Sequence, residues 1–140
     1  MGLRLLGSML LLAALAVNGA ASAQTYPDRP VRILIAFHAG GTIDTLGRIL
    51  AQKLGEGLGG SFFVENTAGA GGTIATGQAA NAAADGTTIL VANQDLIVQP
   101  IIKAKVPYDP FKSLTPVSLV VSAPEMIVVH PSLQVKDLKE

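Results

Sequence analysis

The chain has 140 residues, with ten basic and ten acidic side chains, so its formal net charge is zero when histidine is neutral. No basic cluster suggests a nucleic-acid footprint, and only 4% of the residues are aromatic, which leaves few platforms for stacking bases or sugars. Cysteine is absent, which excludes disulfides and a lipid-attachment site. This length suits one domain or a piece of a larger protein.

The first 23 residues have the features of a secretory signal peptide. Arg4 precedes an apolar stretch from Met9 to Val17, and Ala21-Ser22-Ala23 fits the small-x-small cleavage rule. Cleavage after Ala23 would leave a mature product in the bacterial periplasm. An uncleaved anchor is the alternative, but the apolar stretch is shorter than the ~20 residues of a membrane-spanning helix.

The first predicted strand is the nearly continuous apolar run Val31–Phe37, typical of a strand buried on both faces in a parallel sheet. The glycine turn His38–Asp44 follows. A helix is then indicated by apolar residues at helical spacing, namely Leu46, Ile49, Leu50 and Leu54. Glycines let the backbone turn tightly, and the free N–H groups at a helix start favour a carboxylate or phosphate. The alternative is an ordinary loop with no ligand.

Asp44 falls in the first turn of this helix, with Arg48 one turn further on. A carboxylate there can cap free N–H groups or pair with the arginine, and this structural role is the simpler interpretation. The glycine-rich residues 55–60 are expected to end the helix.

A second unit follows the same plan. Phe62–Asn66 is a short predicted strand, Thr67–Thr73 a second glycine turn, and Ile74–Ala82 an alanine-rich helix. Thr88–Ala92 is a third predicted strand, again mostly apolar, and Asn93-Gln94-Asp95 follows it.

The remaining residues carry weaker signals. A short helix is expected around Gln99–Lys103, with Pro100 restricting it to a start. After a proline-rich loop, Leu114–Val121 and Met126–Val129 are predicted strands. Asp137 and Glu140 have the spacing of a capping box, and because a helix beginning there would bury nothing, we expect the sequence to be cut short.

Three strands alternating with two helices predict a parallel α/β sheet. Ligands bind such sheets beyond the carboxyl ends of the strands. The loops His38–Asp44, Thr67–Thr73 and Asn93–Asp95 all follow strands, so they are expected to meet at one edge and form a binding site.

Catalytic motifs are missing. Gly69-Ala70-Gly71-Gly72-Thr73-Ile74 departs from the dinucleotide fingerprint at its last position, and no glycine is followed by lysine as a P-loop requires. No Gly-x-Ser-x-Gly elbow accompanies the loop at His38. With His130 as the only other imidazole and no cysteine, no zinc site is indicated. We therefore expect a protein that is not an enzyme, with no metal and no cofactor.

Seven short motifs occur in order along the chain after the leader: Tyr26-Pro27-x-x-Pro30, Phe37-x-x-Gly40-Gly41-x-x-Asp44, Val64-Glu65-Asn66-x-x-Gly69-Ala70-Gly71-Gly72, Ala84-Asp85-Gly86-Thr87, Pro107-Tyr108-Asp109-Pro110, Thr115-Pro116-Val117-Ser118-Leu119 and Val128-Val129-x-Pro131-Ser132-Leu133. In this order and near this spacing, the chain resembles the substrate-binding receptors of tripartite tricarboxylate transporters, the Bug family. Each motif is weak alone, and the ordered set is specific.

The resemblance implies a two-lobed receptor of the periplasmic-binding-protein type (type II, Venus-flytrap) that closes on a small carboxylate. A di- or tricarboxylate, an amino acid or an aromatic acid would be held by backbone N–H groups, small polar side chains and water. The implied partners are the membrane subunits of the transporter. By position, the implied ligand-binding residues are Phe37, His38, Ala39, Gly40, Gly41 and Asp44 in the first loop, Gly69, Ala70, Gly71, Gly72 and Thr73 in the second, and Asn93 and Gln94 in the third.

The chain also departs from the family pattern. Ala39 replaces a usual proline, Ile43 a polar residue, and His38 is not typical. Family members are much longer, so we expect residues 24–113 to form most of a first lobe and residues 114–140 to begin a truncated second lobe. Weak binding is then expected. A non-functional fragment, or an α/β enzyme of unidentified activity, remains the alternative.

Overall fold

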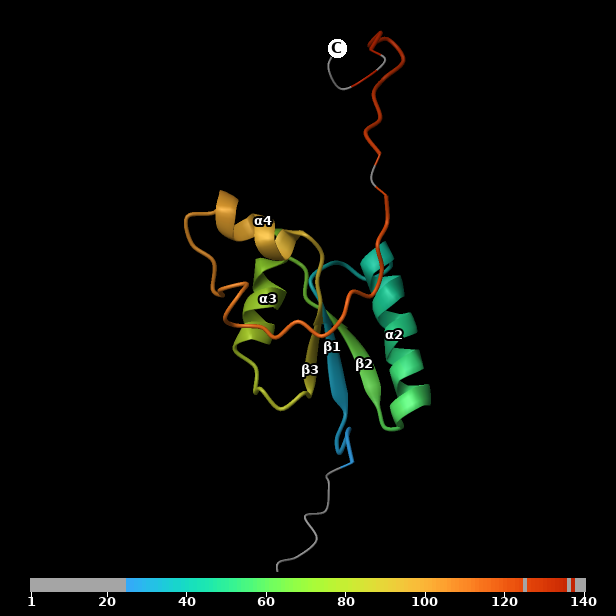
Figure 1. Cartoon of the computed structure of the whole chain (residues 1–140), viewed down its shortest axis with the longest axis vertical. Helices are drawn as coiled ribbons and strands as arrows, with labels where there is room; N and C mark the ends of the chain where they lie inside the picture. Colours follow the sequence, from blue (N-terminus) through green and yellow to red (C-terminus); the bar gives the residue numbers. More distant parts are fainter. Residues whose placement is uncertain (1–24, 125, 136, 138–140) are drawn as a thin grey trace, which may run out of the picture.

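The computed structural model describes residues 25–124, 126–135 and 137. A parallel three-stranded sheet forms its centre, in the order β2-β1-β3 (Figure 1). The strands are β1 (Val31–Ile35), β2 (Phe62–Asn66) and β3 (Thr88–Val91). The predicted parallel α/β architecture is confirmed.

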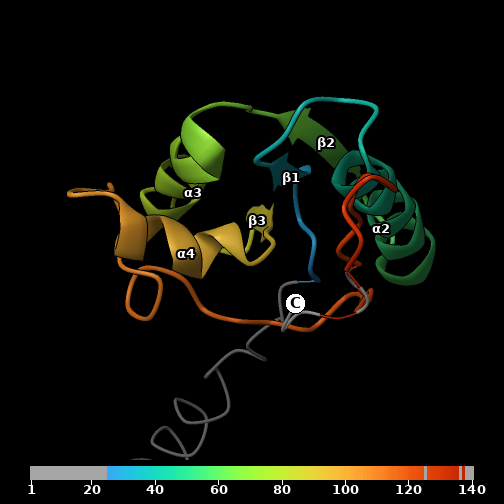
Figure 2. The same ribbon diagram turned by 90° about the horizontal axis from the view of Figure 1, so that it is seen from above.

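Strand β1 lies in the middle of the sheet because both of its faces are apolar. Ile33 and Ile35 pack with α2 (Thr42–Leu58), and Leu34 packs with Ala75 of α3 (Thr73–Ala80). Successive side chains of a strand point to opposite faces, so one strand serves two cores. Figure 2 shows α2 on one side of the sheet, with α3 and α4 (Asp95–Ile102) on the other.

Close approach of α2 to the sheet depends on Gly47. A Cβ atom placed on this residue would lie 2.3 Å from Cδ1 of Ile35. The missing side chain therefore lets the helix that begins at the first loop sit directly on β1.

Helix α2 ends within the glycine-rich residues 55–60. Gly55 and Gly57 lie inside it, and Gly59, with φ +73°, caps its end by donating its N–H to the Gly55 carbonyl at 3.1 Å. The prediction that residues 55–60 end the helix is therefore confirmed, although packing of α2 on the sheet carries it past Gly55 and Gly57 despite the low helix propensity of glycine.

The position of α4 was predicted incorrectly. It begins at Asp95, and Pro100 is its sixth residue rather than an N-terminal one. Proline lacks the N–H that would bond to the carbonyl four residues earlier. That carbonyl, on Leu96, instead accepts a hydrogen bond from the Tyr108 hydroxyl at 3.2 Å.

The two strands expected at Leu114–Val121 and Met126–Val129 are absent from the structure. Residues 114–124 and 126–130 are described without helix or strand, and Val117 is 91% exposed. A strand needs a neighbour, and no other part of the described chain pairs with these residues.

Three other predictions concern residues that are mostly undescribed. The signal peptide and its cleavage site after Ala23 lie outside the described residues, as does the capping box apart from Asp137. Among the described residues, no helix combines the length and the apolar content needed to cross a membrane.

Candidate functional site

The three predicted loops lie at one edge of the sheet. All three strands run in the same direction, so their carboxyl ends are together, and α2, α3 and α4 all begin at that end (Figure 1). The juxtaposition expected from the sequence is therefore present in the fold.

Asp44 holds the first loop in shape. Its carboxylate is only 3% exposed and accepts hydrogen bonds from the Gly40 N–H at 2.8 Å, from Arg48 Nε at 3.0 Å and from Asn66 Nδ2 at 3.0 Å. The Arg48 hydrogen bond, followed by those from Gly40 and Asn66, lowers the pKa of Asp44 from 3.8 to about 2. The carboxylate is thus ionised at neutral pH and already accepts three hydrogen bonds, which favours a positioning role over contact with an anionic ligand.

Asn66 joins the first loop to the end of β2. Besides its bond to Asp44, its side-chain amide donates to the Phe37 carbonyl at 3.1 Å, and its oxygen accepts from Arg48 at 3.5 Å. One side chain therefore connects the carboxyl ends of two adjacent strands.

The rest of the first loop is open to solvent. Phe37 is half-buried and packs against both cores, whereas the next four residues are exposed: His38, Ala39, Gly40 and Gly41. Helix α2 starts at Thr42, and its N-cap residue Gly41 provides no side-chain cap. Because the first N–H groups of a helix have no partner within it, exposed donors remain at this end.

The second loop is shaped by an unusual backbone. Four consecutive residues have positive φ: Gly69 (136°), Ala70 (50°), Gly71 (63°) and Gly72 (82°). They include a single 3₁₀ turn, η1 (Ala70–Gly72), which leads directly into α3. Gly72 caps α3 without a side-chain bond, so this helix also presents uncapped N–H groups.

Close contacts fix this second loop on two sides. A Cβ atom at Gly72 would lie 3.1 Å from the Ala36 side chain, so the loop rests on the end of β1. At Gly71 a Cβ atom would lie 2.5 Å from Nε2 of Gln99 in α4. Gln99 is 8% exposed, and its Oε1 is buried without a hydrogen-bond partner.

A lysine adds positive charge to the second loop. The Lys103 ammonium donates to the Ala70 carbonyl, and also to the Thr73 hydroxyl at 2.9 Å. The Thr73 hydroxyl in turn donates to the Ala70 carbonyl. A cation therefore lies beside the uncapped start of α3.

The residues of the third loop mainly cap the N-terminus of α4. Asn93 accepts a hydrogen bond from the Asp95 N–H at 3.1 Å and donates to the Asp95 carboxylate at 3.2 Å. Gln94 is the N-cap residue of α4. Of the two predicted ligand-binding residues here, Asn93 thus has a local capping role.

Sequence reasoning missed three residues of this edge: Asn66, Gln99 and Lys103. Asn66 could have been found, because it is a polar residue at the carboxyl end of a predicted strand. Gln99 and Lys103 had no such signal, since their positions depend on α4 beginning at Asp95.

The arrangement suits anion binding better than catalysis. Two uncapped helix starts and one ammonium group favour a negative ligand. Within the part of the chain that the structure describes, no three His, Cys, Asp or Glu side chains are grouped to hold a metal ion.

Sequence comparison decides the family. Residues 46–140 match the TctC family, described as the tripartite tricarboxylate transporter family receptor. The chain belongs to this family. The predicted resemblance is therefore confirmed, and so is the prediction that the chain is not an enzyme, because the TctC family is a family of receptors.

Two curated relatives show how much of a TctC protein is present. The chain is 37% identical over 131 residues to Protein BugT of Bordetella pertussis, covering 92% of this chain and 40% of BugT. It is 40% identical over 122 residues to a UPF0065 protein of Bordetella bronchiseptica, covering 86% of this chain and 36% of that protein. The chain thus spans about two fifths of the length of these relatives.

Solved structures support the same fold. The periplasmic binding protein BugD has 41% identity and a TM-score of 0.61, covering 63% of this chain and 29% of BugD. MatC from Rhodopseudomonas palustris with bound malate has 35% identity and a TM-score of 0.60, and the match covers 68% of this chain and 33% of MatC. Rpa4515 from R. palustris with adipate has 33% identity and a TM-score of 0.59, and the match covers 61% of this chain and 29% of Rpa4515.

Proposed function

We propose that this chain is part of a periplasmic solute-binding receptor that captures a small carboxylate at the edge formed by the three loops. The observation that carries the proposal is that α2 and α3 both begin there, without side-chain caps, after glycine loops. The membrane subunits of a tripartite tricarboxylate-type transporter are the proposed recipients of the ligand.

The chemistry of the loops favours a carboxylate. Its oxygens can accept hydrogen bonds from the uncapped N–H groups at the starts of α2 and α3, and the Lys103 ammonium adds a favourable charge. Asp44 would support this indirectly, because its bond to the Gly40 N–H orients the loop. Malate and adipate, bound to MatC and Rpa4515, belong to the same chemical class.

The 140-residue chain is expected to bind weakly. Gly40, Gly41 and Gly71 are exposed, so a carboxylate at this edge stays partly hydrated and its N–H partners also bond to water. We propose a dissociation constant above about 1 mM, which corresponds to a binding free energy weaker than about −4 kcal/mol.

A thermal-shift titration tests this function. The chain, exported through its own leader and purified, is heated with up to ~50 mM malate, adipate or citrate, at constant ionic strength and pH, with chloride as the control anion. Because ~50 mM is at most about fifty times the proposed dissociation constant, mass action can stabilise the folded state by up to about 2.3 kcal/mol. We expect a higher unfolding midpoint with at least one carboxylate. No shift with any of them would contradict carboxylate binding, and saturation at micromolar ligand would contradict the proposed weakness.

Export is a separate part of the proposal. The leader is expected to be cleaved after Ala23, so the mass of the periplasmic product should correspond to a chain that starts at Gln24. Recovery of the intact chain in the membrane fraction would contradict it.

A further inference from the structure

Helix α4 buries a polar side chain and exposes its apolar ones. Gln99 is 8% exposed and is the buried residue of this helix, whereas Ile101 and Ile102 are 78% and 67% exposed. Packing alone normally produces the opposite pattern, since isoleucine is far more often buried than glutamine. The position of Gln99 therefore needs a reason other than packing.

The Gln99 amide is directed at the second loop. A Cβ atom on Gly71 would lie 2.5 Å from Nε2 and 3.0 Å from Oε1 of Gln99, so the amide occupies the space that a side chain at residue 71 would fill. Figures 1 and 2 show α4 beside the start of α3, which this loop precedes. Gln99 thus approaches the proposed ligand-binding edge from the side of α4.

The side-chain oxygen of Gln99 lacks a hydrogen-bond donor. It is buried, and among the described residues nothing donates a hydrogen bond to it. A buried acceptor without a partner destabilises a folded chain, so native proteins retain few of them. Because this oxygen faces a loop that we propose to bind a ligand, the missing donor points to a group on the ligand.

The oxygen can reach the exposed side of the loop. Ala70 and Gly71 are both exposed, and Gly71 has no side chain to cover the amide. The last torsion of a glutamine side chain is broad, so the amide can rotate toward solvent while α4 stays in place. A ligand at the start of α3 can therefore meet this oxygen.

The neighbouring charge determines which kind of donor fits. Lys103, four residues after Gln99, donates from its ammonium group to the Thr73 hydroxyl at 2.9 Å. This ammonium group attracts the carboxylate of a ligand and repels a second cation beside it. A hydroxyl group donates a hydrogen bond without carrying charge, so it suits the Gln99 oxygen better than a ligand ammonium group does.

We propose that Gln99 is a specificity-determining residue that accepts a hydrogen bond from a hydroxyl group on the carbon next to the ligand's carboxylate. The carboxylate then lies at the start of α3 beside Lys103, and the hydroxyl lies beside Oε1 of Gln99. The favoured ligands are 2-hydroxy acids. This inference rests on the proposed carboxylate-binding function and narrows its ligand class.

L-malate and succinate test the role of the hydroxyl, because they differ by this group alone. Each is titrated into the unchanged chain and the unfolding midpoint is measured, at constant ionic strength and at a pH where both acids are dianions. One neutral hydrogen bond changes affinity several-fold, so the dissociation constant for malate should be about three- to tenfold lower than that for succinate. Equal constants would overturn the role of the hydroxyl while leaving carboxylate binding intact. No stabilisation by either acid would contradict carboxylate binding as well.

L-aspartate tests the choice of a hydroxyl over an ammonium group. It carries an ammonium group where malate carries the hydroxyl, so repulsion by Lys103 should make its dissociation constant higher than that of malate. Tighter binding of aspartate than of malate would overturn the assignment of the ligands as 2-hydroxy acids.

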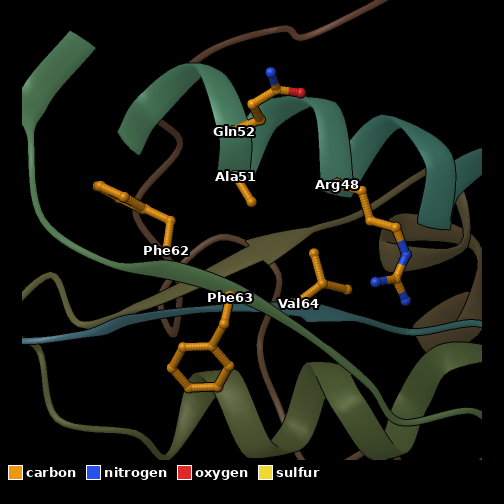
Figure 3. Close-up of a pocket in the computed structure, with 6 residues that line it drawn as sticks. All are labelled: Arg48, Ala51, Gln52, Phe62, Phe63 and Val64. Carbon is orange, nitrogen blue, oxygen red and sulfur yellow. The ribbon is translucent and has the colours of Figure 1, made fainter. Parts of the chain in front are cut away.

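Gln99→Met attributes the preference to this residue. Methionine keeps an unbranched side chain of similar length without the amide oxygen, so the preference for malate over succinate should fall below about twofold. Gln52→Met is the matched control and should keep the preference. Gln52 lies on α2 beside the hollow formed with β2 (Figure 3), and α4 lies on the other side of the sheet (Figure 2). An unchanged preference in Gln99→Met would overturn the proposal.

A measurement on the unchanged chain does not depend on the folding of a variant. In nuclear magnetic resonance spectra of the isotope-labelled and assigned chain, malate should shift the side-chain amide signals of Gln99 more than succinate does. Equal shifts with the two acids would overturn the contact between Gln99 and the hydroxyl.

Discussion

The two glycine loops of the candidate site are held in different ways. Hydrogen bonds to one buried carboxylate, Asp44, fix the first loop. The second loop is fixed by four positive φ angles in succession and by close contact with Ala36 and Gln99. The first arrangement depends mainly on a charged side chain, and the second mainly on backbone conformation and close packing at its glycines.

This difference predicts different weaknesses. A polar network loses strength when its carboxylate is protonated or replaced, while the backbone around it need not move. A sterically defined loop is insensitive to pH and intolerant of any added Cβ atom. Substitutions in each loop, measured with the same stability assay, can distinguish the hydrogen-bonded first loop from the sterically restricted second loop.

The largest effect is expected for Gly72→Val in the second loop. Valine would have to adopt φ +82° and place its Cβ atom 3.1 Å from the Ala36 side chain, so the free energy of unfolding should fall by about 2–4 kcal/mol. Urea titration of the variant and the unchanged chain measures this loss of unfolding free energy.

Gly57→Ala is the matched control for this substitution. Gly57 lies inside α2 with nothing within 4 Å of its Cβ position, so alanine should stabilise the chain by about 0.5 kcal/mol through helix propensity. If both variants lose stability equally, the left-handed backbone is not what restricts Gly72.

The next largest loss of stability is expected for Asp44→Asn, and the contribution of Asp44 to stability also depends on pH. Its pKa is lowered to about 2 in the folded chain, so its contribution to stability is complete above its unfolded pKa, near 4, and is lost as the pH falls toward about 2. Asp44→Asn should lower the unfolding midpoint at neutral pH and weaken its dependence on pH between 4 and 2. An unchanged acid profile in the variant would contradict the role given to this carboxylate.

Asn66→Ala should have a smaller effect. It removes the amide that donates to Phe37 and Asp44, while Asp44 keeps its bonds to Arg48 and Gly40. A loss of about 1–2 kcal/mol is expected from urea titration, because both acceptors lie in partly buried surroundings. Gln52→Ala, on the exposed side of α2, should change stability by less than about 0.5 kcal/mol.

The smallest effect on stability is expected for Lys103→Met. The ammonium bonds to the second loop at a partly exposed position, so its removal should cost less than about 1 kcal/mol. The same variant should weaken the stabilisation by malate or adipate, whereas Lys53→Met, at the exposed Lys53–Glu56 pair, should not. Equal ligand responses would exclude Lys103 from the proposed site.

The strands of the sheet could be predicted because their apolar runs are short, continuous and bounded by turns. Both glycine loops could also be located, since the topology of a parallel sheet brings strand ends together whatever their side chains do. The extent of α4 could not, because the carbonyl that Pro100 leaves without a donor, on Leu96, is satisfied by the Tyr108 hydroxyl in the loop that follows the helix. The strands predicted after Leu114 had an apolar pattern but have no neighbouring strand among the described residues, and an apolar pattern alone does not reveal whether such a neighbour exists.

The bond between Tyr108 and Leu96 has a mechanical consequence. It attaches the connector after α4 to the helix at the carbonyl that Pro100 leaves free. The same helix contacts the second loop through Gln99, and Lys103, which follows it, bonds to Ala70. A displacement of this connector is therefore expected to move the second loop as well, so that α4 couples the proposed ligand-binding edge to the residues that follow the helix.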